Sequence, residues 1–358
     1  MLPPYTTTVR QNRKIVESVD AGEVNQYKYK VGKLNQMGPL EVEVNLPTFV
    51  PGQVNLSELK ESFGKLNLTE IITSTSMSNT VAYSAALTAE KLLDEVIEIA
   101  EFWTDENLRH LSCTGPQEVW VSYDKKAYID RLDVRGSDVK SFMSTCLDWN
   151  GYPSGISVTR KGELVYTDKK YGFVNVYRDG RHKPLIMVQQ GWQPIAVYCT
   201  KLEDFLVSLK SVDDRVCKII RYKGKAIIQE MAKDNRGDPL YKGGNKMLYV
   251  TENINSDVIA SDCNAQIVAV VNSTGALRYH FKGHKSIKGK FTPGCTVTDS
   301  KGRILVEDDG NDCIQIIDQD GQYLKHLNYC GILSLDTLGR LWVGKFIGKK
   351  VNLIKYTE

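Results

Sequence analysis

The chain has 358 residues, of which 42% are hydrophobic and 25% are charged, the proportions of an ordinary globular protein rather than a fibrous or wholly disordered one. Its 46 basic and 43 acidic side chains leave a formal charge of only +3, which excludes a whole-molecule field that attracts a polyanion. No apolar run reaches the roughly 18 residues of a membrane helix, so we expect no membrane partner.

The first 90 residues contain little apolar material for a core. Threonines cluster at 6–8, serines and threonines at 69–84, and a proline-containing stretch spans 46–51. We expect residues 1–90 to be a flexible leader, with one short helix near 56–66, rather than a second domain.

A strand is expected directly after this leader. Apolar and acidic residues are interspersed from Val96 to Phe102, as in a strand with one exposed face. The competing interpretation is an amphipathic helix, because Glu and Ala favour helix over strand.

Six copies of one short segment follow. Each opens with a charged residue and continues with three mostly apolar, β-favouring residues, as in a strand buried on both faces. The copies start 45, 41, 53, 46 and 37 residues apart, close to the roughly 40 to 50 residues of a propeller blade. They are Glu118–Tyr123, Glu163–Asp168, Asp204–Leu209, Asp257–Asp262, Arg303–Asp308 and Arg340–Lys345.

The rest of each repeat supplies the other strands of a blade. A second apolar run follows each copy and, in the first five repeats, ends at a glycine that lets the chain reverse before a shorter run. The sequence therefore predicts an all-β fold, a six-bladed β-propeller over residues 91–358. The sixth copy reaches Glu358 without a fourth strand, and we expect residues 92–102 to supply it and close the ring.

Two of the repeats resemble the NHL repeat. The matching residues are Pro153–Val158, Gly162–Asp168, Val174–Tyr177 and Gly180 in one, and Pro293–Val297, Gly302–Asp308, Asn311, Ile314–Ile317 and Gly321 in the other. The resemblance covers about residues 92–358, and repeats one, three and six depart from it, with Tyr123, Leu209 and Lys345 at the aspartate position. Leu46–Leu66 looks like the linker before the propeller in tripartite-motif proteins with NHL repeats.

This resemblance implies a non-catalytic propeller that recognises a protein target, as the target-binding part of TRIM-NHL ubiquitin ligases does. The RING, B-box and coiled-coil parts of that family have no counterpart here, because the eight cysteines include no Cys-x-x-Cys pair and no heptad run is present. We therefore expect no enzymatic activity in this chain, reduced thiols and a cytoplasmic location, and the oligomeric state stays open.

The basic segment 278–290 is the first candidate surface, with five Lys or Arg residues and no acid. Cations neutralise phosphates and exposed rings stack on unpaired bases, so single-stranded RNA is an alternative partner, as in some proteins of the family. The competing interpretation is a solvated outer strand and loop with Tyr279 and Phe281 packed inward. The candidate residues are Arg278, Tyr279, His280, Lys282, Lys285, Lys288 and Lys290.

The longest insertion, residues 231–246, is the second candidate surface. It is either a recognition loop or an ordinary tolerated insertion. Its candidate residues are Asp234, Arg236, Asp238, Tyr241 and Lys242.

A further alternative is a metal-dependent propeller enzyme, because related propellers hold a metal with acidic residues around the central channel. Asp168, Asp262 and Asp308 share one blade position, but recurrence favours a structural role, in which each accepts hydrogen bonds from the turn that follows. His280 and His284 are four residues apart in a predicted strand and turn, where their rings need not share a face. We expect no cofactor, no metal and no catalytic residue.

Overall fold

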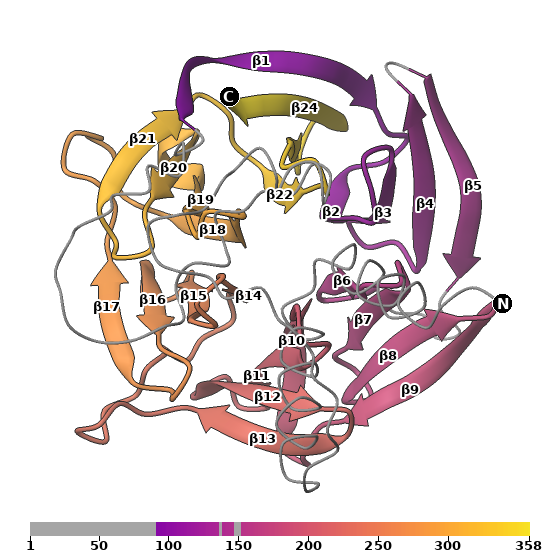
Figure 1. Cartoon of the computed structure of the whole chain (residues 1–358). Coiled ribbons are helices and arrows are strands. Elements are labelled where there is room, and N and C mark those ends of the chain that lie inside the picture. The colour runs from indigo at the N-terminus through magenta and orange to yellow at the C-terminus, as the bar shows by residue number, and fades with distance from the viewer. Residues whose placement is uncertain (1–90, 136–137, 147–151) are drawn as a thin grey trace, which may run out of the picture. The chain divides into compact units, whose positions relative to one another are not determined.

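The computed structural model describes residues 91–135, 138–146 and 152–358. The expected leader and its short helix lie outside these residues. The described strands form six four-stranded antiparallel sheets around a central channel, which confirms the six-bladed propeller (Figure 1). No helix among the described residues is long and apolar enough to cross a membrane.

The blades follow one another along the chain. Blade 1 consists of β2 (Leu108–Cys113), β3 (Glu118–Tyr123), β4 (Tyr128–Arg135) and β5 (Asp138–Cys146). Blade 2 consists of β6 (Ile156–Val158), β7 (Leu164–Asp168), β8 (Phe173–Arg178) and β9 (Arg181–Met187). Blade 3 consists of β10 (Trp192–Cys199), β11 (Phe205–Ser211), β12 (Cys217–Lys223) and β13 (Ala226–Met231).

The second half of the ring repeats this order. Blade 4 consists of β14 (Leu248–Glu252), β15 (Val258–Asp262), β16 (Ile267–Val271) and β17 (Leu277–Phe281). Blade 5 consists of β18 (Pro293–Thr298), β19 (Ile304–Asp308), the 3-10 turn η3 (Asp309–Asn311), β20 (Cys313–Ile317) and β21 (Tyr323–Leu327). Blade 6 consists of β22 (Ile332–Leu335), β23 (Leu341–Gly344), β24 (Lys350–Thr357) and β1 (Leu92–Trp103).

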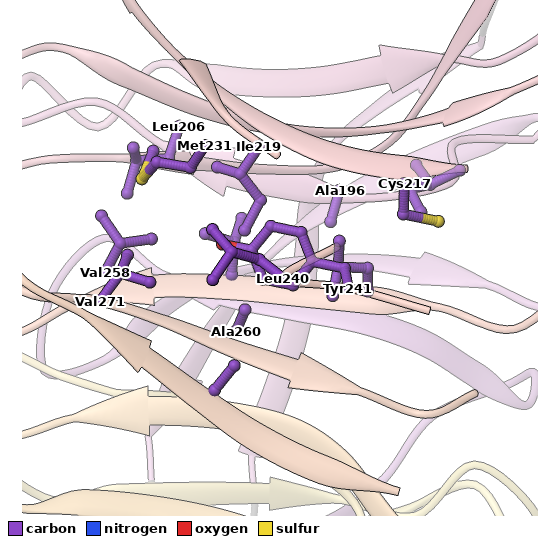
Figure 2. Packing of buried hydrophobic residues seen from close by; sticks show 14 residues of the cluster. Ala196, Leu206, Cys217, Ile219, Met231, Leu240, Tyr241, Val258, Ala260 and Val271 are labelled. Atoms are coloured by element: carbon purple, nitrogen blue, oxygen red, sulfur yellow. The ribbon is translucent and has the colours of Figure 1, made fainter. Parts of the chain in front are cut away.

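The six recurring segments are the second strands of the blades. In these strands the apolar residues are almost completely buried, because each sheet is covered by a neighbour on both faces. Between blades 3 and 4, for example, Leu206, Ile219 and Met231 pack against Val258 and Val271 (Figure 2). The core is therefore a set of layers between adjacent blades.

The ring closes as the sequence predicts. β1 pairs antiparallel with β24, and Phe102 lies opposite Val351 in the register. The Phe102 side chain is only 2% exposed and meets the Trp342 ring edge-on, with the ring centroids 5.9 Å apart. The helical interpretation of this segment is wrong, because pairing with β24 satisfies its backbone and removes an open sheet edge.

Strand direction decides which loops meet at each end of the channel. Neighbouring strands are antiparallel, so the first strand of a blade begins where its second strand ends, and the connection from the previous blade arrives at the same end. We call this end of the ring the mouth face. It collects the turns between second and third strands and the connections between blades.

Candidate functional site at the channel mouth

The first strands of all six blades surround a central cavity of about 270 Å³. Near the mouth face, one residue of the first strand lies opposite the fifth residue of the recurring segment in the same blade. The cavity residues of this layer are His110, Gly155, Ala196, Tyr249, Cys295 and Ile332. A small ligand that enters the channel from the mouth meets these residues first.

Glu307 breaks the pattern of the repeat at this layer. The fifth residue of the recurring segment is small in every other blade: Ser122, Thr167, Ser208, Ser261 and Gly344. Several of these residues bind the first strands, as Ser122 Oγ does with Nδ1 of His110 at 2.8 Å and Ser208 Oγ does with the Leu248 carbonyl. Blade 5 therefore has a carboxylate at the position where the other five blades have a small side chain. Locally inconsistent residues of this kind are expected at functional sites.

The local backbone is built around this carboxylate. Oε2 of Glu307 accepts a hydrogen bond from the backbone N–H of Cys295 at 2.8 Å, which directs the carboxyl group toward the channel-lining strand β18. Residue 294 is glycine, and a Cβ atom there would lie 2.1 Å from Oε2 of Glu307. The absence of a side chain at Gly294 therefore makes room for the carboxyl group.

Burial changes the titration of Glu307. It raises the pKa of this carboxyl to about 7, and the nearby charge of Asp309 acts in the same direction. No Lys or Arg forms an ion pair with Glu307 or Asp309 in the part of the chain that the structure describes. Glu307 is thus a half-buried carboxyl group with a pKa of about 7, and groups with such shifted pKa values are candidates for function.

Glu307, Asp309 and Cys330 are the one set of three ligand-type residues that the described residues bring together, with ligand atoms within 4.8 Å of one another. Two carboxylates fall short of the six or more oxygens that Mg²⁺ and Ca²⁺ prefer, and a catalytic zinc set normally includes histidine. The Cys330 thiol donates a hydrogen bond to Oε1 of Glu307 at 3.7 Å, and burial together with the Glu307 charge raises its pKa. This set does not fit a resident metal, and we derive no step through one.

Cationic side chains from blades 1 to 3 approach the same end of the channel. Arg109 lies in β2, Lys169 directly follows β7, and Lys210 lies near the end of β11. The Tyr249 hydroxyl lies in the cavity wall, and both the Glu307 carboxyl group and the Arg109 guanidinium act on its pKa. Burial raises its pKa well above the usual value, and Glu307 adds to this shift while Arg109 opposes it. The Tyr249 phenol thus lines the cavity, and the Glu307 carboxyl group and the Arg109 guanidinium lie close enough to act on it.

The basic segment starts at the face opposite the mouth and ends at the mouth face, and its first residues are engaged in packing. Arg278 forms ion pairs with Asp257 and Asp320, and the Tyr279 hydroxyl donates to the Gln319 carbonyl at 3.2 Å. Phe281 is buried against Phe291, as the inward-packed interpretation expects. The exposed members of the predicted surface are Arg278, His280, Lys282, Lys285, Lys288 and Lys290.

The end of this segment reaches the candidate site. The Lys290 carbonyl accepts a hydrogen bond from Nδ2 of Asn311, at the end of the η3 turn that contains Asp309. The His284 ring stacks on the Tyr323 ring of blade 5, with the ring centroids 3.9 Å apart. His284 is therefore engaged in a packing contact.

The second predicted surface is also a mouth-face connection, because it joins β13 to β14. Asp234 accepts hydrogen bonds from the backbone of Arg236 and Asp238, and the backbone N–H of Lys242 donates to Oδ2 of Asp262 at 2.7 Å. Tyr241 is only 3% exposed and packs in the core between blades 3 and 4 (Figure 2). Tyr241 therefore anchors this loop, and its other candidate residues stay a prediction.

The recurring aspartates have the structural role that the repeat suggests. Oδ1 of Asp168 accepts from the backbone N–H of Tyr171, and Oδ1 of Asp262 accepts from those of Asn264 and Ala265. Asp308 accepts from the backbone N–H of Thr292 and from the Gln315 amide. Glu307, the residue before Asp308, is what sequence reasoning missed, although its difference from the other five copies is visible in the sequence.

No protein-family model matches the chain, and no curated protein matches it. Among solved structures, the chain is similar to a gluconolactonase from Xanthomonas campestris, with a TM-score of 0.52, 14% identity, and coverage of 76% of this chain and 93% of that one. A putative gluconolactonase matches with a TM-score of 0.52, 14% identity and coverage of 74% and 92%. A streptogramin B lyase matches with a TM-score of 0.50, 12% identity and coverage of 72% and 97%.

At this identity the likeness shows the fold alone, but it corrects one expectation. The NHL resemblance implied a non-catalytic recognition module in the manner of a tripartite-motif protein. The three solved propellers named above are described as two gluconolactonases and a lyase, not as tripartite-motif proteins, and the row of small side chains around the channel is interrupted by the half-buried carboxyl group of Glu307. These comparisons therefore contradict the expected non-catalytic recognition module of the tripartite-motif kind.

Proposed function

We propose that this propeller is an enzyme of the hydrolase or lyase class, with its active site at the mouth of the channel and Glu307 as its general base. The observation that carries the proposal is the half-buried carboxyl group of Glu307, which occupies a position that is small in the other five blades. The NHL resemblance of two repeats describes the sequence of the blades and assigns no chemistry to this site.

A carboxylate with a pKa near 7 is well matched to proton transfer at neutral pH. A general base works best when its pKa lies near the operating pH, because enough of it is ionised while it still binds a proton strongly. Burial raises the pKa of Glu307 to about 7, so this residue meets both conditions. It is fixed by the Cys295 N–H on Oε2, and its proton-accepting atom is Oε1, beside the Cys330 thiol.

The same base serves hydrolysis and elimination. In hydrolysis the carboxylate removes a proton from a water molecule as its oxygen attacks a carbonyl carbon, and in elimination it removes the proton from carbon. Both routes build up negative charge on a substrate oxygen. The Tyr249 hydroxyl and the Arg109 guanidinium are donors at the same mouth, and preorganised donors stabilise such charge. The matched gluconolactonase and lyase structures support the two reaction classes.

The proposal is tested with the full chain and a panel of small lactones and esters, including D-gluconolactone, assayed by proton release at pH 7.5. We expect turnover of at least one lactone or ester, lowered at least about 100-fold in kcat by Glu307→Gln, since a general base contributes roughly 10² to 10⁴. The matched control is Asp179→Asn, which removes an exposed carboxylate from the turn between β8 and β9, away from the mouth face. No turnover across the panel, or turnover that Glu307→Gln leaves unchanged, would contradict the proposal.

A further inference from the structure

Three consecutive blades bring one cation each to the mouth. Arg109 comes from blade 1, Lys169 from blade 2 and Lys210 from blade 3. Lys169 and Lys210 occupy the same position of the repeat, directly after the recurring segment. Blades 1 and 5 carry Asp124 and Asp309 at this position. These three cations therefore lie on one arc of the ring, and blade 5, which carries Glu307, lies across the channel from blade 2 (Figure 1).

The carboxylates near these cations are too few to pair all of them. Lys210 forms an ion pair with Asp214, and NH1 of Arg109 lies 3.3 Å from Oδ1 of Asp124. Lys169 has no ion-pair partner among the residues that the structure describes. Three cations thus meet two carboxylates, and the uncompensated charge is on Lys169.

Arg109 retains a further donor for a ligand. Its guanidinium lies over the Tyr152 ring, 5.1 Å from the centroid, which fixes its plane. Its Nε–H is buried and has no acceptor in the described part of the chain. A buried donor without a partner is costly, and a bound acceptor removes that cost.

We propose that Arg109, Lys169 and Lys210 form an anion-binding subsite, so that the substrate of this enzyme carries a carboxylate or phosphate group beside its reacting bond. The inference rests on the proposed function of the mouth. The anion would be held on the arc of blades 1 to 3, and the reacting bond would point across the channel to Glu307. Charge-assisted hydrogen bonds to such groups are short and strong, and they fix orientation as well as affinity.

The titration of Lys169 supports this assignment. Burial lowers its pKa, and the neighbouring Lys210 and Arg109 lower it further by repulsion. A bound anion relieves that repulsion, so the empty subsite is electrostatically unfavourable and the occupied one is not.

The test measures binding of inorganic phosphate and of acetate, each alone, to the full chain by isothermal titration calorimetry at low salt. We expect one site per chain, binding that weakens as salt is raised, and at least a tenfold weaker Kd in Lys169→Gln. The control is Lys225→Gln, which removes an exposed lysine from the turn between β12 and β13, away from the mouth face. Preference for phosphate or for acetate tells which anion the substrate carries. Binding of neither anion, or equal binding by Lys169→Gln and wild type, would overturn the inference.

Folding and activity are measured on the same variant. Lys169→Gln removes a repelled charge, so we expect its melting temperature to equal or exceed that of wild type, which separates lost binding from lost folding. If Glu307→Gln has no effect on turnover while Lys169→Gln loses the anion, the proposed general base fails and the subsite stands. If Glu307→Gln abolishes turnover while Lys169→Gln leaves KM and anion affinity unchanged, the subsite fails and the proposed function stands.

Discussion

Gly294 and Glu307 face each other across the two strands of blade 5, and a Cβ atom on residue 294 would lie 2.1 Å from Oε2 of Glu307. A Cβ atom cannot approach an oxygen this closely, so the observed position of the Glu307 carboxyl group requires glycine at 294. Through this pair, blade 5 holds a half-buried carboxyl group against the channel-lining strand β18.

Gly294→Ala should therefore expel the Glu307 carboxyl group from its position. We expect the hydrogen bond to the Cys295 N–H to break and the pKa of Glu307 to fall from about 7 toward its usual 4.5, because the group moves into water. Carbon-detected NMR titration of the glutamate side chains measures this shift. The control is Gly115→Ala, where a Cβ meets nothing within 4 Å, and an unchanged pKa in Gly294→Ala would contradict the packing described.

Glu307 should also make the protein less stable as pH rises. Its pKa in the folded state, about 7, is above the usual 4.5, so the folded state holds this proton more tightly than the unfolded state. The stabilisation is complete below pH 4.5 and is lost as pH rises through 7, with a slope of up to about 1.4 kcal/mol per pH unit.

Glu307→Gln removes this contribution, so urea unfolding at pH 8 should show a variant that is more stable than wild type by up to about 3 kcal/mol. Near pH 4.5 the two proteins should differ little, because the wild-type carboxyl is then protonated. Parallel stability curves between pH 4.5 and 8 would show that Glu307 ionises freely in the folded state. A gain in stability with loss of turnover is the usual sign of a strained functional group.

The fold is predictable from the sequence because it depends on repetition. A charged residue and three mostly apolar residues recur six times, with a small residue next in five of the copies, and a closed ring of sheets buries such segments on both faces. The strand at 92–102 is predictable for a related reason, since the sixth repeat lacks a fourth strand and an open edge must be covered.

The site is harder to predict because it lies in a departure from repetition. Asp168, Asp262 and Asp308 attract attention as recurring acids, and all three accept hydrogen bonds from local structure. Glu307 becomes visible only when the fifth residue of each copy is compared across the blades. The convergence of Arg109, Lys169 and Lys210 cannot be read from the sequence at all, because it depends on three blades meeting at one end of the channel.

The closing strand supplies a test of the ring itself. Phe102 is buried against Trp342, so Phe102→Ala should lower the free energy of unfolding by about 3 to 5 kcal/mol, the usual cost of removing a buried aromatic ring. Ile97→Ala, on the same strand but 52% exposed, should change it by less than about 0.5 kcal/mol. Chemical denaturation of both variants measures the difference, and equal effects would mean that β1 does not seal blade 6.

His110 should make the protein less stable at acid pH. It is buried in the channel wall, and burial, with the neighbouring charge of Arg109, lowers its pKa to about 3. Between pH 6.5 and 3 the unfolded chain therefore takes up a proton that the folded chain does not. Stability is complete above pH 6.5 and falls as pH is lowered, by up to about 1.4 kcal/mol per unit.

This effect opposes that of Glu307 between pH 4.5 and 6.5, so it is best measured in Glu307→Gln. In that background, stability should fall steadily from pH 6.5 to 4, and adding His110→Gln should flatten the curve, because the second variant has no imidazole to protonate. His110→Gln also removes the 2.8 Å contact between Nδ1 of His110 and Ser122 Oγ. That loss is the same at every pH, so it shifts the whole stability curve and does not change its slope. An equally steep decline with and without His110 would place the acid sensitivity of the propeller elsewhere.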